Sequence, residues 1–307
     1  MKKYYKIMLG SKNIYSKECL EGNFIGIDEK IYQDLTSQLP DNWRDFNRKF
    51  IPIWLNKNPG KNKIAAGLAC GAIWTITKGM EIEDVLILAI DEDKFRVGEI
   101  ISGYEYHPNG ILPHRRMVKW HSNPLSKSDM SDVLKTTVKH YGTVTDLNRF
   151  SEELEKLVKG DISRIISSSP EIEDPYSFAM EKHLEEFLVR NWSQTQLGKD
   201  YFIFSEEGEL VGQQYPSDTG PIDVLAISKD KKTLLVVELK KGRASDNVVG
   251  QIQRYMGYVK EELAEEGQIV KGVIIALEDD LRIKRALSVT SNIEFFRYQV
   301  SFNLIRG

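Results

Sequence analysis

Three charged residues flank two hydrophobic segments in the second half of the sequence. Asp223 stands near the start of GPIDVLAIS, and Glu238 and Lys240 stand near the end of VVELKKG. Two desolvated carboxylates repel each other, and a divalent cation removes that repulsion. With the carbonyl of Leu239, two carboxylates leave octahedral positions of Mg²⁺ for water and a phosphate oxygen. The pattern predicts metal-assisted chemistry in which Lys240 orients or activates the attacking water.

The hydrophobic segments around these residues predict an antiparallel hairpin. Residues 221–228 and 233–241 have the composition of strands, and KDKK forms the turn between them. The start of the first strand then lies opposite the end of the second. Alternation with a period of two places Glu238 and Lys240 on one face and turns Leu239 into the core. We therefore expect Asp223 and Glu238 to converge at one edge of the sheet.

The other predicted elements indicate an α/β layout with a mixed sheet in the second half. There, further strands are predicted at 201–207, 270–277 and 293–302, and helices at 177–192, 246–262 and 279–289. The first half has predicted strands at 4–9, 22–28, 85–90, 95–106 and 116–120, and a helix at 63–79. Short strands around one or two helices predict a small, strongly curved sheet or barrel.

The order GPID and then E-x-K resembles the PD-(D/E)XK nuclease superfamily. In the next helix, VVGQIQRYMGYV, Gln251 and Tyr255 match the Q-x-x-x-Y element of the RecB-like and Mrr-like branches, and this spacing puts them on one helical face. An acidic helix before the hairpin is also a superfamily feature. The segment MEKHLEEFL supplies Glu181 and Glu185 for it, of which Glu185 is favoured. Residues 176–305 are similar to the NucS-like nuclease domain and its restriction-enzyme relatives in order and spacing.

This resemblance implies a metal-dependent DNA endonuclease. Asp223 and Glu238 would hold Mg²⁺, for which Mn²⁺ would substitute, and Lys240 would position the water. Glu185 would assist through the metal or the water. Gln251 and Tyr255 would brace the site and touch the DNA backbone. Lys241 and Arg243 could contact phosphates, although charges that follow a strand are also typical of a solvated turn. Cleavage of both strands normally requires two such centres, so we expect a homodimer.

Residues 4–120 lack a paired acid, nucleophile and base at a suitable spacing, which favours binding over chemistry. The patterns KGM followed by EDVLIL, and VGEI followed by YHP, resemble the PUA-type barrel in its EVE and YTH-related forms. Members of those families flip a base into an aromatic pocket and often recognise a modified one. Residues 29–62 form an insert that the compact form of the family does not predict.

Flat side chains around a cleft are the requirement for holding a flipped base, and each stacked base gains about 1–3 kcal/mol. The candidates are Phe24, Trp54, Trp74, Tyr104 and Tyr106, with His114, Arg115 and Arg116 as possible phosphate contacts. Phe24 and Trp74 are the first pair to test by their position in the EVE-like pattern. Core packing is the alternative for each aromatic residue, and solvated surface is the alternative for the HRR cluster.

The composition agrees with a globular protein of two domains. The 307 residues are 41% hydrophobic and 28% charged, with no stretch apolar enough to span a membrane. A net charge of -3 provides no global attraction to a polyanion, so contacts with nucleic acid must be local. Two cysteines make no disulfide framework, which favours a reducing cytoplasm. The expected parts are a reader at 1–158, a linker at 159–175 and a nuclease domain at 176–307.

Together these features predict a modification-dependent restriction endonuclease, with a role in defence by implication. One alternative is a NucS-type repair nuclease that acts on mismatched or branched DNA. Another is a binding protein whose nuclease fold is catalytically silent and whose first half reads RNA.

Overall fold

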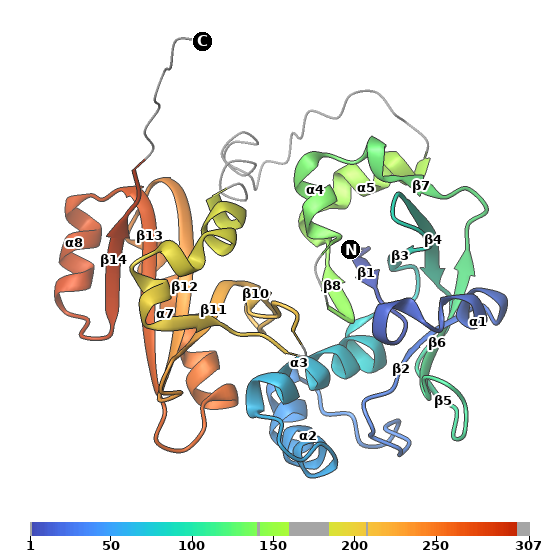
Figure 1. The fold of residues 1–307 in the computed structure, drawn as a ribbon. Helices are drawn as coiled ribbons and strands as arrows, with labels where there is room; N and C mark the ends of the chain where they lie inside the picture. Colours follow the sequence, from blue (N-terminus) through green and yellow to red (C-terminus); the bar gives the residue numbers. More distant parts are fainter. Residues whose placement is uncertain (1, 140–141, 160–183, 207, 300–307) are drawn as a thin grey trace. The chain divides into compact units, whose positions relative to one another are not determined.

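The computed structural model describes residues 2–139, 142–159, 184–206 and 208–299 (Figure 1). The chain divides into two compact units, residues 1–171 and 172–307. The expected linker lies outside the described residues except for Lys159, and so does Glu181. No helix in the described ranges combines the length and the apolar character that crossing a membrane requires.

The N-terminal unit is built on an eight-stranded sheet of order β2-β6-β4-β3-β1-β8, with β5 beside β6 and β7 beside β4. Within it β1 runs parallel to β3, and the other neighbours are antiparallel. The strands are β1 (Tyr4–Ile7), β2 (Phe24–Ile27), β3 (Val85–Ala89), β4 (Lys94–Ile100), β5 (Glu105–Tyr106), β6 (His114–Trp120), β7 (Leu125–Ser126) and β8 (Val144–Asp146). The predicted fold class, short strands in a curved sheet with helices, is confirmed (Figure 1).

Five α-helices accompany this sheet: α1 (Ser16–Glu21), α2 (Trp43–Lys57), α3 (Lys63–Trp74), α4 (Asp132–Thr137) and α5 (Ser151–Lys159). A π-helical turn, Thr75–Gly79, extends α3. Helix α2 lies in the insert at residues 29–62, which the compact form of the EVE-like family does not predict, and it packs on α3. The absence of a side chain at Gly71 permits this contact, because a Cβ there would lie 2.5 Å from the Trp43 ring.

The C-terminal unit has a six-stranded mixed sheet of order β10-β11-β12-β13-β14, with β9 beside β11. Its strands are β9 (Tyr201–Ile203), β10 (Gln213–Tyr215), β11 (Ile222–Ser228), β12 (Thr233–Arg243), β13 (Ile269–Glu278) and β14 (Ile293–Arg297). Strands β10, β11 and β12 are antiparallel, whereas β12, β13 and β14 are parallel. The parallel crossovers contain α7 (Asn247–Tyr258) and α8 (Leu281–Ser288), and residues 184–190 form a further helical segment.

Shorter turns complete the chain. The 3-10 turns are Ser11–Asn13, Lys127–Asp129, Asn148–Phe150, Trp192–Gln194 and Leu197–Lys199, and a π-helical turn, Val259–Leu263, follows α7.

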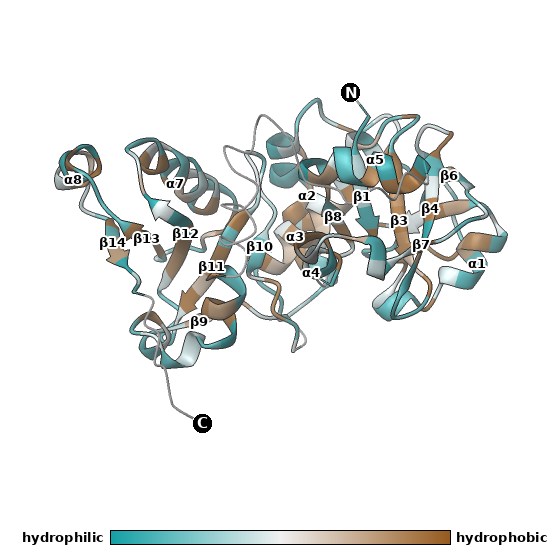
Figure 2. Ribbon diagram, turned by 90° about the horizontal axis from the view of Figure 1, so that it is seen from above, coloured by the Kyte–Doolittle hydropathy of each residue, from teal (hydrophilic) through white to brown (hydrophobic). Residues whose placement is uncertain are grey.

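The central strands of the C-terminal sheet are buried on both faces. Residues 234–237 of β12 are at most 1% exposed, and residues 224–226 of β11 are fully buried. Figure 2 shows the apolar colours along β11, as it does along β3 of the N-terminal unit. Burial on both faces explains why these strands are continuous hydrophobic runs. A polar residue at the end of such a strand is therefore held by a rigid support.

Candidate active site

The pairing of β11 with β12 brings the predicted acids together. Val224 lies opposite Val237, so the next pair toward the sheet edge is Asp223 opposite Glu238. Residues directly opposite in an antiparallel pair project to the same face. The backbone N–H of Leu239 donates to Asp223 Oδ2 at 2.8 Å, which fixes that carboxylate against the end of β12. The predicted convergence of the two acids is confirmed.

Lys240 lies on the same face as Glu238. Its Nζ is 3.0 Å from Glu238 Oε1, and Glu238 is 2% exposed. A buried carboxylate is costly without a nearby positive charge, and the ammonium provides one. Leu239, between them, is buried in the core as the alternation predicts.

Glu185 reaches this face from the helical segment 184–190. It is buried, and it accepts hydrogen bonds from Gln213 Nε2 at 2.7 Å and from Gln214 Nε2 at 2.6 Å. The Gln214 amide also donates to Asp223 Oδ1 at 3.1 Å. The favoured acid of the upstream helix is therefore linked to Asp223 through an amide. The sequence reasoning did not identify these glutamines.

Gln251 and Tyr255 lie one helical turn apart on α7, where Gln251 Nε2 donates to the Tyr255 hydroxyl at 3.2 Å. Burial raises the pKa of Tyr255, and the negative charges of Glu238 and Asp223 raise it further. The phenol therefore stays protonated and can act as a donor beside the acids. A Cβ added at Gly220, whose φ is +120°, would lie 3.3 Å from this hydroxyl, so Tyr255 also packs against the loop that precedes β11.

The donor set suits a hard divalent cation. The carboxylates of Asp223 and Glu238 and the carbonyl of Leu239 are oxygen ligands of the kind that Mg²⁺ and Mn²⁺ accept. Within the described ranges, no three acidic, histidine or cysteine side chains gather closely enough to hold a metal by themselves. A cation at this site would therefore depend on the backbone carbonyl and on solvent for its remaining ligands. When bound, it would polarise a phosphoryl oxygen and acidify a coordinated water.

Lys241 and Arg243 follow the site on β12. The carbonyl of Lys241 accepts a hydrogen bond from the Tyr298 hydroxyl. The Arg243 side chain is 63% exposed and lies 4.0 Å from Asp280 Oδ2. A shift in the register with β13 between Lys240 and Arg243 changes the direction of the strand at this point. A phosphate contact by either side chain stays a prediction.

Three of the aromatic candidates in the N-terminal unit belong to its core. Phe24, Trp54 and Trp74 are 7%, 6% and 9% exposed. The Arg115 guanidinium covers the Phe24 ring at 3.9 Å, and Trp54 Nε1 donates to Glu29 Oε2 at 3.2 Å. In this structure the three rings pack in the core, which agrees with the core-packing alternative, and a role for them in holding a base stays a prediction.

His114 is fully buried and makes two hydrogen bonds, and its expected phosphate contact stays a prediction. Its Nε2 lies 2.7 Å from the carbonyl oxygen of Ile31, which can only accept, so Nε2 carries the proton and donates. In the neutral ring Nδ1 then accepts a hydrogen bond from the Tyr104 hydroxyl at 2.9 Å. Burial lowers the pKa of His114, so its neutral form is favoured. The rings of Tyr104 and Tyr106 lie 5.8 and 5.3 Å from that of His114, and these two half-buried tyrosines stay candidates for stacking.

Arg116 lies inside the N-terminal unit, and its expected phosphate contact stays a prediction. It is 5% exposed, and its guanidinium donates to the carbonyls of Ile76, Thr77 and Ser102. It therefore ties β6 to the π-helical turn after α3. Arg115 is half-buried, and its Nε donates to the carbonyl of Leu112 at 3.0 Å.

Replacing Arg116 with methionine is expected to lower the free energy of unfolding by about 3 kcal/mol, because two buried carbonyls and one partly buried carbonyl lose their donor. Urea unfolding of the full chain measures this loss, and Arg115→Met is the matched control with a smaller expected effect. Wild-type stability of the Arg116 variant, together with reduced affinity for DNA, would support the phosphate-contact interpretation.

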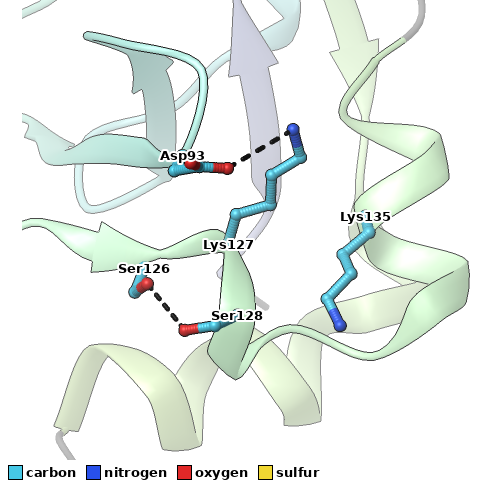
Figure 3. A pocket seen from close by; sticks show the side chains of 5 residues that line it. All are labelled: Asp93, Ser126, Lys127, Ser128 and Lys135. Carbon is cyan, nitrogen blue, oxygen red and sulfur yellow. Dashed lines mark hydrogen bonds and ion pairs between the residues drawn. The ribbon is translucent and has the colours of Figure 1, made fainter.

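The N-terminal unit also has a shallow hollow, lined by Asp93, Ser126, Lys127, Ser128 and Lys135 (Figure 3). Lys127 Nζ donates to the carbonyl of Glu92 at 2.8 Å and lies 4.0 Å from Asp93 Oδ1. The hydroxyls of Ser126 and Ser128 bond to each other at 2.8 Å. The acid offsets part of the lysine charge, so the hollow is not a strong anion site.

In the C-terminal unit a hairpin that ends in two facing acids and a lysine is followed by a helix and two parallel strands, which is the order that the resemblance to the PD-(D/E)XK superfamily implies. Residues 180–301 match the family described as "Endonuclease NucS C-terminal domain". The predicted resemblance to this superfamily in its NucS-like form is therefore confirmed for the C-terminal unit. Residues 5–148 match a different family, described as "Domain of unknown function (DUF8426)".

Two curated relatives carry the name Endonuclease NucS. The protein of Pyrococcus abyssi is 30% identical over 113 residues, which are 34% of this chain and 43% of that protein. The protein of Methanocaldococcus jannaschii is 31% identical over 93 residues, which are 30% of this chain and 34% of that protein. The chain thus matches less than half the length of either relative.

Among solved structures, a repair endonuclease from Pyrococcus abyssi is similar at 16% identity with a TM-score of 0.31. The alignment covers 69% of this chain and 64% of that one.

Proposed function

We propose that this protein is a metal-dependent DNA endonuclease that cleaves at a modified base, with its hydrolytic centre at Asp223, Glu238 and Lys240. The observation that carries the proposal is the placement of Lys240 Nζ 3.0 Å from Glu238, on the face that Glu238 shares with Asp223. The match of residues 180–301 to the NucS C-terminal domain supports the reaction class.

Hydrolysis would proceed by attack of a water oxygen on the phosphorus, with cleavage of the P–O bond to the leaving sugar oxygen. The attacking water would release a proton to solvent, and the leaving oxygen would take one up from solvent. The Lys240 ammonium orients that water and offsets the negative charge that develops on the phosphoryl oxygens. The carboxylates of Asp223 and Glu238 would hold Mg²⁺, for which Mn²⁺ would substitute. The protonated Tyr255, braced by Gln251, donates to the DNA backbone. Two centres cut the two strands, so the active species is a homodimer.

The N-terminal unit would select the substrate. Two half-buried tyrosines of this unit, Tyr104 and Tyr106, lie against His114. Such rings suit stacking on a base, which gains about 1–3 kcal/mol. The Arg115 guanidinium over Phe24 adds a planar cation near the start of β6.

The second candidate is a nuclease that recognises a mismatch or branch in unmodified DNA. It is favoured by the curated relatives, since both are named Endonuclease NucS. In that case the N-terminal unit would recognise distorted DNA.

Digestion of one plasmid in several modification states separates the two candidates. The substrates are unmodified DNA, DNA methylated at adenine or cytosine, and DNA with hydroxymethylated or glucosylated cytosine, all with Mg²⁺. We expect cleavage of one modified form, with unmodified DNA cut at least about tenfold more slowly, because one good base contact discriminates by 1–3 kcal/mol. Equal cleavage of all forms would reject modified-base recognition, and selective cleavage of a mismatched or branched duplex would establish the second candidate.

A further inference from the structure

Gln214 lies between two acids of the candidate site. In β10, Gln213 pairs with Val224 and Tyr215 with Ile222, so Gln214 lies opposite Asp223. Its Nε2 donates to Glu185 Oε2 at 2.6 Å and to Asp223 Oδ1 at 3.1 Å. One amide nitrogen therefore bridges a carboxylate of the upstream helix and a carboxylate of the hairpin.

The backbone is specifically shaped for this bridge. Neighbouring side chains of a regular strand point to opposite faces, yet the amides of Gln213 and Gln214 both reach Glu185. The φ of Gln214 is +51°, a left-handed conformation that breaks the alternation. Such a conformation is uncommon for a residue other than glycine and tends to occur at functional sites.

The amide N–H groups of Gln214 act on the two carboxylates as a weakly positive group would. The two N–H bonds of the amide present the positive end of its dipole, and the carboxylates of Glu185 and Asp223 receive them. The reverse orientation would place the amide oxygen against two anions. A cation bound by Asp223 would compete for the lone pairs of the carboxylate oxygen that accepts from Gln214. Its charge would also repel the N–H groups beside it.

We propose that Gln214 is a placeholder for the divalent cation. In the metal-free protein its amide holds Glu185 and Asp223 in position against their mutual repulsion, and it leaves Asp223 when the cation binds. The inference depends on the proposed function, because it assumes a cation at Asp223. Gln214 is thus a positioning residue that acts through the two acids.

A fixed structural role makes the opposite prediction. If Gln214 held both acids in the same way with and without the cation, its removal would disorder the ligands and weaken cation binding. If it is a placeholder, its removal costs the metal-free state a bond to Asp223 that the metal-bound state has already given up, so the cation binds more tightly. The direction of the change in affinity therefore distinguishes the two roles.

The test is a calorimetric titration of the full-length protein with Mg²⁺ alone, in the absence of DNA. For Gln214→Ala we expect the Kd for Mg²⁺ to fall by about tenfold, the size of one hydrogen bond to a charged group. Gln214→Asn should shift the Kd in the same direction, because its amide is too short to span both acids, and asparagine tolerates a positive φ. Gln213→Ala is the matched control, since Gln213 bonds to Glu185 without bridging, and it should not tighten binding.

Thermal unfolding provides a second measurement. The Gln214→Ala protein should have a lower Tm than the wild type without metal, and the difference should narrow at saturating Mg²⁺, where only the bond to Glu185 is still missing. Weaker or unchanged Mg²⁺ binding by both Gln214 variants, equal tightening in the Gln213 variant, or a Tm difference that Mg²⁺ does not narrow would overturn the placeholder role. A wild-type protein that binds no Mg²⁺ would instead refute the proposed function.

Discussion

Asp223→Asn is expected to reduce DNA cleavage by about 10³-fold or more while DNA binding is retained. The asparagine carbonyl can still accept the N–H of Leu239, which contacts Asp223 at 2.8 Å, so this bond to the backbone of β12 is kept while the contact to Gln214 is lost. The charge that holds the cation is lost, and effects of this size are typical of groups on which the chemistry depends. Cleavage of a labelled duplex and fluorescence anisotropy of the same duplex measure the two properties separately.

Asp230→Asn provides the control within the same hairpin. Asp230 lies in the turn between β11 and β12, where it accepts hydrogen bonds from the Ser228 hydroxyl and the Lys232 N–H. This variant should cleave DNA at the wild-type rate. Full activity of the Asp223 variant would place the chemistry elsewhere. If the wild-type protein cleaves no DNA, and the Asp223 variant binds nucleic acid as the wild type does, the silent binding protein is favoured.

Lys240→Met is expected to lower the cleavage rate by about 10²-fold or more and to destabilise the metal-free protein. Loss of the ammonium leaves Glu238, which is 2% exposed, without its ion-pair partner at 3.0 Å. Removal of one partner from a fully buried pair costs about 3–5 kcal/mol. Because the Lys240 side chain is 31% exposed, we expect a smaller loss, on the order of 2 kcal/mol.

Mg²⁺ should restore most of that stability, because a cation beside Glu238 compensates its charge. Urea unfolding with and without Mg²⁺ measures the recovery, and Lys232→Met, in the exposed turn of the hairpin, is the control. A Lys240 variant that cleaves normally would show that the lysine is only a structural partner of Glu238. A loss of stability that Mg²⁺ does not reverse would argue against a cation next to that acid.

The hairpin and its acids could be predicted because strong local signals specify them. Two hydrophobic segments with a four-residue charged turn define β11 and β12, and the register follows from the turn. Alternation then assigns the faces of Glu238, Leu239 and Lys240. Helix α7 could be predicted equally well, because the spacing of Gln251 and Tyr255 matches one helical turn.

The glutamines of β10 could not be predicted from the same signals. The strand has three residues, and its backbone departs from strand geometry at Gln214. Without a hydrophobic segment or regular alternation, no pattern places Gln213 and Gln214 next to Glu185. Only the folded chain, in which the helical segment 184–190 lies against β10, brings these residues together.

The N-terminal unit shows two further limits of sequence patterns. Helix α2 contains Pro52, which is unusual inside a helix, although Asn42 is a good N-cap and residues 46, 50 and 54 define a buried face. The same aromatic residue types line pockets and fill cores, so the sequence does not distinguish the two. Burial alone separates Phe24 and Trp74, which lie in the core, from Tyr104 and Tyr106, which lie at its margin.

Crystals of the full-length protein grown with Mn²⁺ and measured at a wavelength where manganese scatters anomalously would locate the cation directly. We expect an anomalous peak within bonding distance of the carboxylates of both Asp223 and Glu238, with the Gln214 amide turned away from Asp223. Manganese bound elsewhere in a crystal of active enzyme, with those two carboxylates making no contact to it, would refute a hydrolytic centre at the end of this hairpin.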